Sequence, residues 1–347
     1  MKPKIALLID RPDWAFANIA RNLERHLSDR FEFDIIPHLY SGDLARSMLA
    51  TKESDLVHFF WRNDLRMVLS DDAFRWHVKS MFGNSERFFH EYVDRTRMST
   101  AVYDHQFLDE DSIARFKRTY HQAQGYYVCS NKLNEIYAGI DSYPNPSAVL
   151  EDGVDLSLFQ PKNLQRLRRR KRQLVVGWAG NSLWGDPSKD PKGFHTLLKP
   201  ALAKLQSRGL PVEGRFADRV DGLKPHTQMV DYYSSIDVYV CPSLHEGTPN
   251  PVLEAMACGV PVISTDVGVV RDVFGPEQSR LILDDRSVDA LAGKLTDLVD
   301  NPRTLTELSQ ENIESIQDWD WSVKTQGFAE FFTECLDERP TLRSEAG

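Results

Sequence analysis

Cysteine is scarce in this chain, which has only four cysteines among its 347 residues. They are Cys129, Cys241, Cys258 and Cys335, which lie far apart and form neither a C-x-x-C pair nor a spacing typical of a metal site. The first three have apolar neighbours, which predicts buried thiols. The pattern does not support a disulfide framework or a metal module, and it favours a reducing cytoplasm as the setting.

Long apolar runs and two common phosphate-binding loops are absent as well. Near the N-terminus only Ile5 to Ile9 is continuously apolar, which is too short for a signal peptide or a transmembrane helix. No G-x-G-x-x-G follows the first predicted strand of either half, and G-x-x-x-x-G-K-[ST] does not occur. We therefore expect a soluble, cytoplasmic protein that is neither a dinucleotide-dependent dehydrogenase nor a P-loop enzyme. Peripheral contact with the inner face of a membrane stays open.

The chain also has no excess of positive charge. It contains 42 Lys and Arg residues and 51 Asp and Glu residues, which gives a net charge of −9. Nucleic acid is therefore not an expected partner, because binding to a phosphate backbone needs a broad basic face. One compact basic run, from Arg166 to Arg172, precedes a predicted strand. We interpret this run as a solvated interdomain linker, and contact with anionic lipid is the alternative.

What the sequence does contain is an α/β pattern that occurs twice. Apolar or β-branched runs alternate with stretches that favour helix, first up to Leu150 and again from Leu174. With 41% hydrophobic residues, the chain is long enough to bury two cores. The predicted strands are 5–9, 33–36, 56–60, 100–103, 126–129 and 147–150, followed by 174–179, 212–216, 236–241, 260–264 and 280–283.

The most informative segment is 242–258, which reads P-S-L-H-E-G-T-P-N-P-V-L-E-A-M-A-C. Its first part is rich in turn-forming residues, follows an apolar run and precedes residues that favour helix, so the segment predicts strand, loop and helix. Asn250 can cap this helix, and Pro251 suits its first position. The free N–H groups of the first helical turn would then face an anion such as a diphosphate.

Two acidic residues flank this anion site, namely Glu246 on the loop and Glu254 about one turn into the helix. Each carboxylate can accept hydrogen bonds from paired hydroxyls, as a sugar presents them. Taken alone, either residue is more typical of a solvated surface acid. The surrounding string decides between these readings.

The string from Glu246 to Ile263, E-G-T-P-N-P-V-L-E-A-M-A-C-G-V-P-V-I, closely resembles the Glu-x7-Glu segment of the retaining glycosyltransferases of family four. Further stretches extend the resemblance over most of the chain, namely 149–155, 176–181 with 189–193, and 231–242. The resemblance implies the GT-B architecture, an α/β fold of two facing Rossmann-like doubly wound domains with an interdomain cleft. The donor would bind in the second domain and the acceptor in the first.

On this resemblance we expect an N-terminal acceptor-side domain at 1–165 and a C-terminal donor-binding domain at 166–320. Residues 321–347 would form a helix that crosses back to the first domain, followed by a tail. Trp319 and Trp321 would then pin the hinge between the two domains.

The resemblance also assigns roles on the donor side. Glu246 would bind the donor sugar, Glu254 the ribose, and Lys192 the diphosphate. Asn181, after Gly180, stands where many relatives have Arg, so one cation of the phosphate clamp is missing. A neutral amide supplies neither charge nor a bidentate fork.

The loop that carries the first glutamate has an unusual donor set. Pro249 and Pro251 have no N–H, so Thr248, Asn250 and Val252 are left to offer backbone donors to sugar hydroxyls or phosphate.

In the predicted first domain His105 is the main candidate, and on the resemblance it would bind hydroxyls of the donor sugar from across the cleft, as a catalytic residue together with Glu246 and Lys192. It follows the predicted strand 100–103, which resembles the family strand that ends in a histidine lining the sugar site, and Asp104 could orient its ring. His58 is a weaker candidate, because its aromatic neighbours favour core packing. Asp13 and Trp14 lie in an aromatic loop that either contacts an acceptor sugar or covers the first helix.

The predicted function is transfer of a sugar, with retention of anomeric configuration, from a nucleoside diphosphate sugar, most simply a UDP- or GDP-sugar. The acceptor would be a hydroxyl of a glycan or lipid-linked glycan in cell-surface polysaccharide synthesis. No cofactor and no metal are implied. The alternatives are a non-catalytic nucleotide-sugar binder or complex subunit, and a sugar-nucleotide epimerase or phosphorylase on the same fold.

Overall fold

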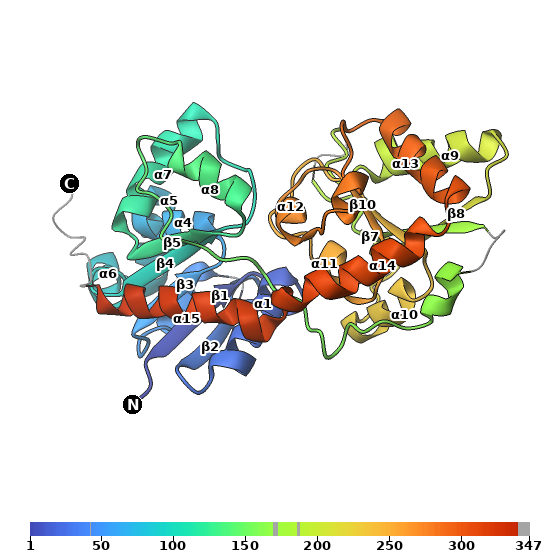
Figure 1. The fold of residues 1–347 in the computed structure, drawn as a ribbon. Coiled ribbons are helices and arrows are strands. Elements are labelled where there is room, and N and C mark those ends of the chain that lie inside the picture. Colours follow the sequence, from blue (N-terminus) through green and yellow to red (C-terminus); the bar gives the residue numbers. More distant parts are fainter. Residues whose placement is uncertain (42, 169–172, 186–187, 339–347) are drawn as a thin grey trace. The chain divides into compact units, whose positions relative to one another are not determined.

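A computed structural model describes residues 1–41, 43–168, 173–185 and 188–338 of the chain (Figure 1). It divides into two compact units, one of Met1–Glu151 together with the chain from Lys324 onward, the other of Asp152–Val323. The predicted boundary at 165/166 therefore differs from the observed one by fourteen residues. The reason is that Val154 and Phe159 are buried in the core of the second unit, and Val154 N–H donates to the Trp319 carbonyl at 2.8 Å.

The first unit is built on one six-stranded parallel sheet with the order β2-β1-β3-β4-β5-β6. The four inner strands β1, β3, β4 and β5 are almost fully buried, as in a doubly wound sheet, whereas the edge strands β2 and β6 are only partly buried. The predicted strands of this half are confirmed, with ends that shift by up to three residues. Their bounds are β1 Lys4–Ile9, β2 Glu32–Pro37, β3 Leu56–Phe59, β4 Arg97–Val102, β5 Gly125–Val128 and β6 Ala148–Val149.

Helices connect these strands. Polar caps begin several of them; Asp109 at the start of α7, for example, accepts a hydrogen bond from Ser112 N–H. The helices are α1 Ala15–Leu27, α2 His38–Ser41, α3 Leu44–Leu49, α4 Arg62–Ser70, α5 Asp72–Phe82, α6 Ser85–Tyr92, α7 Glu110–Gln122 and α8 Asn131–Ala138.

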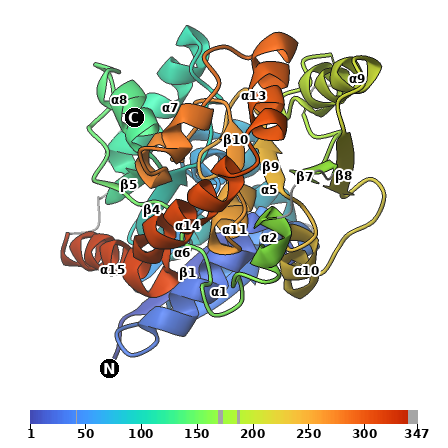
Figure 2. The ribbon, with the colours of Figure 1, turned by 45° about the vertical axis from the view of Figure 1, so that its right-hand side comes forward.

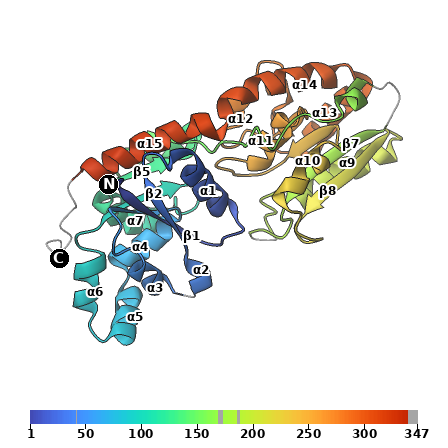
Figure 3. The same ribbon diagram turned by 90° about the horizontal axis from the view of Figure 1, so that it is seen from below.

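The last helix, α15 (Trp321–Asp337), packs with its C-terminal part on the first unit. Phe328 contacts Tyr127 edge to face, and Phe332 contacts Phe31 and Phe33 in the same way. Figure 3 shows α15 running beside the strands of this unit. The predicted tail past Pro340 lies outside the described residues.

The second unit holds a four-stranded parallel sheet with the order β10-β9-β7-β8. Alternate residues of β9 enter different cores: Val238 and Val240 face one, and Tyr239 and Cys241 face the other. Both faces are therefore buried at β9, which explains why β9 is continuously apolar, whereas the edge strand β8 is only partly buried. The strands are β7 Leu174–Gly180, β8 Val212–Asp218, β9 Val238–Cys241 and β10 Val262–Ser264.

Helices cover both faces of this sheet, and α9 and α13 lie side by side on one of them (Figure 2). The α-helices are α9 Lys199–Ser207, α10 Met229–Tyr233, α11 Asn250–Ala257, α12 Val270–Val273, α13 Val288–Asp300 and α14 Thr304–Ser315. The short helices are η1 Leu164–Arg168, η2 Phe194–Leu198, η3 His226–Gln228, η4 Gln278–Leu281 and η5 Ile316–Trp319.

One predicted strand is wrong. Residues 280–283 do not extend the sheet, because the chain forms η4 and then touches β10 through a single bridge between Ser264 and Ile282. The side-chain amide of Gln278 pairs with the backbone at the edge of β10 instead. Its Oε1 accepts from Val262 N–H at 3.2 Å, and its Nε2 donates to the Val262 carbonyl at 2.5 Å.

The basic run is only partly a solvated linker. Arg166 is buried, and its guanidinium donates to the Ile236 carbonyl at 2.6 and 2.9 Å and to the carbonyls of Lys162 and Asn163. Residues 169–172 lie outside the described residues. Within the described part of the chain, no helix has both the length and the apolar character needed to cross a membrane.

Candidate functional site

The loop between β9 and α11 carries Glu246 at the carboxyl end of the second sheet. Its Oε1 accepts hydrogen bonds from Lys192 Nζ at 2.6 Å and from Ser243 Oγ at 2.7 Å. The lysine and glutamate side chains are 24% and 16% exposed, so the ion pair is largely shielded from solvent. The structure thus joins two predicted site residues that lie 54 positions apart in the sequence.

Close backbone contact brings Lys192 to this place. Gly193 has a φ of +66°, and a Cβ there would collide with the Pro242 carbonyl. Arg286 fastens the same two loops, since its Nε donates to the Pro242 carbonyl at 3.0 Å and its Nη2 to the Asp190 carbonyl at 2.8 Å. Only a residue without Cβ lets the loop that carries Lys192, called the lysine loop below, lie against the end of β9.

Asp190 holds the other side of the lysine loop. Its Oδ2 accepts from the N–H groups of His195 and Thr196 at 2.8 and 2.7 Å, at the start of η2. Burial alone would raise the pKa of Asp190, but the hydrogen bonds from Thr196 and His195 outweigh it and lower that pKa. This carboxylate therefore stays ionised and occupies the N–H groups that could otherwise meet a phosphate.

Gly180 and Asn181 lie where β7 ends, at the same edge of the sheet. Asn181 Oδ1 accepts from Leu183 N–H at 3.0 Å, which makes Asn181 a turn residue. The turn leads to Trp184, which is 44% exposed and whose ring centroid lies 5.0 Å from Lys192 Nζ. The cation next to Glu246 is therefore Lys192, between a carboxylate and an aromatic face.

The start of α11 differs from the prediction. Pro249 has φ −74° and ψ 81°, an inverse γ-turn in which Asn250 N–H donates to the Thr248 carbonyl at 2.9 Å. Val252 N–H donates to the Pro249 carbonyl at 2.8 Å. Asn250 is thus the first helical residue, not a side-chain cap. Its N–H group and that of Val252 are already used, which corrects their predicted role as backbone donors.

Thr248 contributes through its side chain. Its hydroxyl oxygen accepts from Asp152 N–H at 3.4 Å, which ties the glutamate loop to the first residue of the unit.

Glu254 is held on both oxygens. His226 Nε2 lies 2.8 Å from Oε1, and Tyr233 donates its hydroxyl to Oε2 at 2.7 Å. Burial, followed by the charge of Glu254, raises the pKa of Tyr233 well above its ordinary value, so that hydroxyl remains a donor. His226 was not predicted, because it lies in a polar segment without a motif.

The two cysteines near this site are unreactive. Burial raises the pKa of Cys241 to about 11 and that of Cys258 to about 12, so neither forms a thiolate near neutral pH. The prediction of buried thiols is confirmed for Cys129, Cys241 and Cys258, and Cys335 is buried as well.

In the first unit, His105 follows β4 by three residues and is half-buried. Its predicted partner Asp104 accepts hydrogen bonds at Oδ1 from the buried Arg62 at 2.5 Å and from Gln106 N–H at 2.9 Å. Arg62 also donates to the Gln106 carbonyl at 2.8 Å. Asp104 and Arg62 therefore fix the loop on both sides of His105, and orientation of the His105 ring by Asp104 stays a prediction.

His58 is a core residue. It is completely buried, its Nδ1 lies 2.9 Å from Ser99 Oγ, and its ring stacks on Tyr127. Burial lowers its pKa to about 3. This corrects the weak prediction of an acceptor contact and supports the packing alternative.

The buried His58 should make the stability of the protein depend on pH. Because its pKa falls from 6.5 to about 3 on folding, the unfolded state binds the proton first, so the contribution is complete above pH 6.5 and is lost as the pH falls toward 3. We expect the loss to be about 1.4 kcal/mol per pH unit in that window. Urea unfolding at several pH values would measure it. His58→Gln, which does not titrate, should show a shallower dependence; identical curves would contradict the argument.

The loop before α1 divides into two parts. Phe16 packs against Phe60 with ring centroids 5.4 Å apart, so it covers the helix. Trp14 is 37% exposed, with the guanidinium of Arg11 4.6 Å from its ring centroid, and Asp13 is exposed. Asp13 and Trp14 therefore remain exposed, whereas Phe16 is half-buried.

A buried polar cluster was also missed. At the carboxyl ends of β1 and β2, His38 Nδ1 contacts the Ile9 carbonyl at 2.8 Å, and its Nε2 lies 3.3 Å from Asp64. Burial raises the pKa of Asp64 to about 6 and also raises that of Asp10. This edge is where open α/β sheets place ligands, and Asp10 after a predicted strand was a visible signal.

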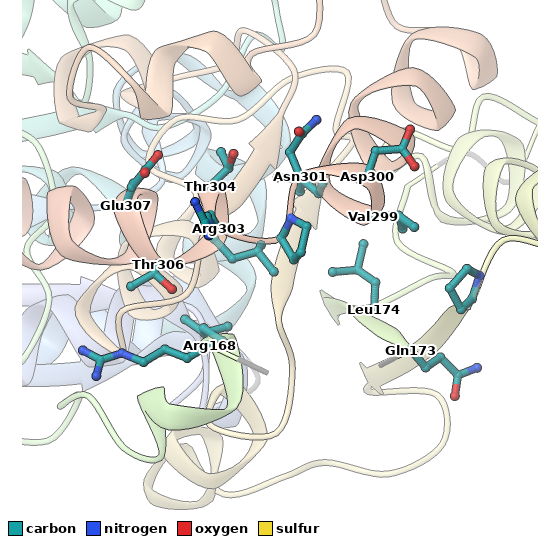
Figure 4. A pocket seen from close by; sticks show the side chains of 15 residues that line it. Arg168, Gln173, Leu174, Val299, Asp300, Asn301, Arg303, Thr304, Thr306 and Glu307 are labelled. Carbon is teal, nitrogen blue, oxygen red and sulfur yellow. The ribbon is translucent and has the colours of Figure 1, made fainter. Parts of the chain in front are cut away.

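A cavity of about 1280 Å³ lies at the opposite edge of the second sheet (Figure 4). Leu174 begins β7 and Pro211 precedes β8, while Asn301 and Arg303 come from the turn between α13 and α14. Ligands of parallel sheets bind beyond the carboxyl ends of the strands, so this cavity is separate from the site around Glu246.

Part of the second unit is similar in sequence to a known protein family. Residues 217–315, which include both glutamates, match glycosyl transferases group 1. D-inositol 3-phosphate glycosyltransferase of Thermobispora bispora is 30% identical over 240 residues, 60% of this chain and 56% of that protein. The lipopolysaccharide core biosynthesis mannosyltransferase LpsB of Rhizobium meliloti is 41% identical over 110 residues, 30% of this chain and 29% of LpsB. The matched regions thus span about half of these relatives or less.

Among solved structures, Anabaena Alr3699/HepE in complex with UDP-glucose is similar over 95% of this chain and 99% of that chain, with a TM-score of 0.66 and 14% identity. At this identity the likeness shows the fold, which is GT-B. Together these findings confirm the predicted resemblance to the group 1 glycosyltransferases and the predicted fold class.

Proposed function

We propose that this chain, which is similar to the group 1 glycosyl transferases at residues 217–315, transfers a sugar from a nucleoside diphosphate sugar to a hydroxyl with retention of anomeric configuration. The observation that carries the proposal is the ion pair between Lys192 and Glu246 at the carboxyl end of the second sheet. A cation for phosphate and an acid for sugar hydroxyls lie side by side there. Glu254, with its carboxylate held in place, supplies the ribose contact.

In the proposed mechanism the donor displaces Lys192 from Glu246. The lysine then binds the diphosphate, where negative charge develops as the bond between the anomeric carbon and the phosphate oxygen breaks. Glu246 turns to the donor sugar and accepts from its hydroxyls. The acceptor oxygen bonds to the anomeric carbon on the same face, its proton passes to the departing phosphate, and the nucleoside diphosphate leaves. The positive end of α11 adds to the charge that Lys192 supplies, so no metal is invoked.

The first unit is proposed to bind the acceptor. His105, on a loop that Arg62 and Asp104 hold in place, is proposed to hydrogen-bond hydroxyls of the donor sugar. Asp13 and the exposed face of Trp14 offer a hydrogen-bond acceptor and a stacking surface to a glycan. A glycan or lipid-linked glycan suits these residues, and cell-surface polysaccharide synthesis is the proposed setting, in the cytoplasm or at the inner face of a membrane.

The nucleotide is proposed to be UDP or GDP. Alr3699/HepE, which shares the fold, was solved with UDP-glucose, and this supports UDP as the first candidate.

A thermal-shift panel with UDP, GDP, ADP, CMP and dTDP tests the proposal. A ligand at 100 times its dissociation constant stabilises a protein by about 2.7 kcal/mol, so the right nucleotide should raise the melting temperature by several degrees. A shift with one nucleoside diphosphate supports the donor site and identifies the base. If no nucleotide shifts the melting temperature, the proposed donor site is wrong.

A second function is favoured by one observation. Asn181 supplies a turn where relatives often have a cation, so a protein that binds the nucleotide sugar without transferring it is the competing hypothesis. Release of nucleoside diphosphate from the identified donor in the presence of acceptor would reject this hypothesis, and nucleotide binding without release would support it. Product analysis without acceptor would separate transfer from epimerisation.

A further inference from the structure

The ribose-binding glutamate is oriented by two protein donors before any ligand arrives. Glu254 is only 9% exposed, and each of its carboxylate oxygens faces one donor. Because a carboxylate accepts and does not donate, His226 contributes an N–H to Oε1 at 2.8 Å and Tyr233 an O–H to Oε2 at 2.7 Å. Rotation of this carboxylate would break both bonds.

The two donors differ in their surroundings. Tyr233 is completely buried in the core of the second unit. The imidazole of His226 is 46% exposed at the start of η3, and one edge of its ring contacts the buried Phe159, with centroids 5.0 Å apart. His226 is therefore held on one side by packing and stands at the surface beside Glu254.

We propose that His226 is a positioning residue that, with Tyr233, orients Glu254 for the two ribose hydroxyls of the nucleotide and so sets the preference for ribose over 2′-deoxyribose. The inference rests on the proposed function, in which Glu254 binds the ribose. A carboxylate has about four lone-pair sites, and the two protein donors use one on each oxygen. One site on each oxygen is left, which matches a pair of neighbouring hydroxyls.

Preorganisation explains why such a contact is useful. A free glutamate side chain would lose rotamer freedom when it binds the ribose, and that loss would weaken the complex. Here His226 and Tyr233 have already ordered the side chain, so a correctly placed diol gains both hydrogen bonds at little further entropic cost. A nucleotide without the 2′-hydroxyl leaves one carboxylate oxygen without its partner.

The test compares UDP with 2′-deoxy-UDP by isothermal titration calorimetry on the full chain. The parent protein should bind UDP about tenfold more tightly, the size expected for one hydrogen bond to a charged group. His226→Ala should reduce this ratio by about threefold or more. His226→Gln should restore it, because the glutamine Nε2 also donates. Gln228→Ala, at an exposed position on the same short helix, is the matched control and should leave the ratio unchanged.

Several results would overturn the inference. If His226→Ala weakens both nucleotides equally, or if the parent protein does not distinguish them, His226 does not position the ribose contact. Melting temperatures of the variants show whether the fold is kept, and His226→Gln carries the test if the alanine variant is unstable. Should neither uridine nor guanosine diphosphates bind the parent protein, the proposed function itself fails, and the inference with it. The first failure leaves nucleotide binding intact, so the two failures are distinguishable.

Discussion

Replacing Glu246 with alanine is expected to lower kcat/KM for sugar transfer by about 100-fold or more, while nucleotide binding is retained. The carboxylate accepts from Lys192 and Ser243 in the free protein and is proposed to accept from the donor sugar during transfer. Its removal deletes contacts that matter when the sugar separates from phosphate. The affinity for UDP should stay constant or rise, because Lys192 no longer has to leave an ion pair.

The two readouts make this variant informative. Activity is measured as nucleotide release from the donor that the panel identifies, and UDP affinity by calorimetry. Glu277→Ala is the matched control, since Glu277 is a half-exposed acid of the same unit that pairs with Arg280 at the surface and should be dispensable. If Glu246→Ala transferred sugar as fast as the parent protein, Glu246 would have no role in the mechanism. If the variant lost UDP binding together with activity, Glu246 would have a structural role instead.

The strands could be predicted from sequence because they carry their signal locally. Val238–Cys241 and its neighbours are short runs of apolar and β-branched residues, as expected for strands buried on both faces. The failure at 280–283 came from a tertiary effect. Gln278 pairs with the edge of β10 through its side-chain amide, and no local sequence pattern predicts that a side chain will replace a strand.

The candidate site shows the same contrast between signals that are local in the sequence and contacts that depend on tertiary packing. The resemblance predicts Glu246, Glu254 and Lys192 as site residues, but it does not indicate which groups they contact. The pair of Lys192 with Glu246 depends on the approach of Gly193 to Pro242, and the link of His226 to Glu254 joins an exposed turn to a buried helix. Such contacts are set by how loops pack, which a linear pattern does not encode.

The start of α11 illustrates a local misprediction. Asn250 followed by Pro251 suggested a side-chain cap, since both residues favour helix starts. Pro249 fixes its own φ near −74°, and the γ-turn that follows uses the Asn250 N–H before the helix begins. The turn chemistry of Pro249 therefore prevailed over the capping preference of Asn250.

Replacing Gly268 with alanine is expected to destabilise the second unit by about 2 kcal/mol or more and to disorganise the donor site. Gly268 has a φ of +51°, which an alanine adopts only with strain, and a Cβ at this position would collide with the Gly247 carbonyl. Gly247 follows Glu246 directly. The glutamate loop must therefore move away from Gly268 to admit the methyl group, and Glu246 moves with it.

Gly293→Ala is the matched control and should act in the opposite direction. Gly293 lies inside α13, and no atom comes within 4 Å of an added Cβ, so alanine should stabilise the helix by about 0.5–1 kcal/mol. Urea unfolding and UDP titration of both variants check the prediction. If Gly268→Ala were as stable as the parent and bound UDP equally well, the loop would have room to adjust. Gly268 is far from Glu246 in the sequence, but it lies against Gly247, the residue after Glu246. A joint loss of stability and of UDP binding would therefore show that the loop after β10 supports the loop that carries Glu246.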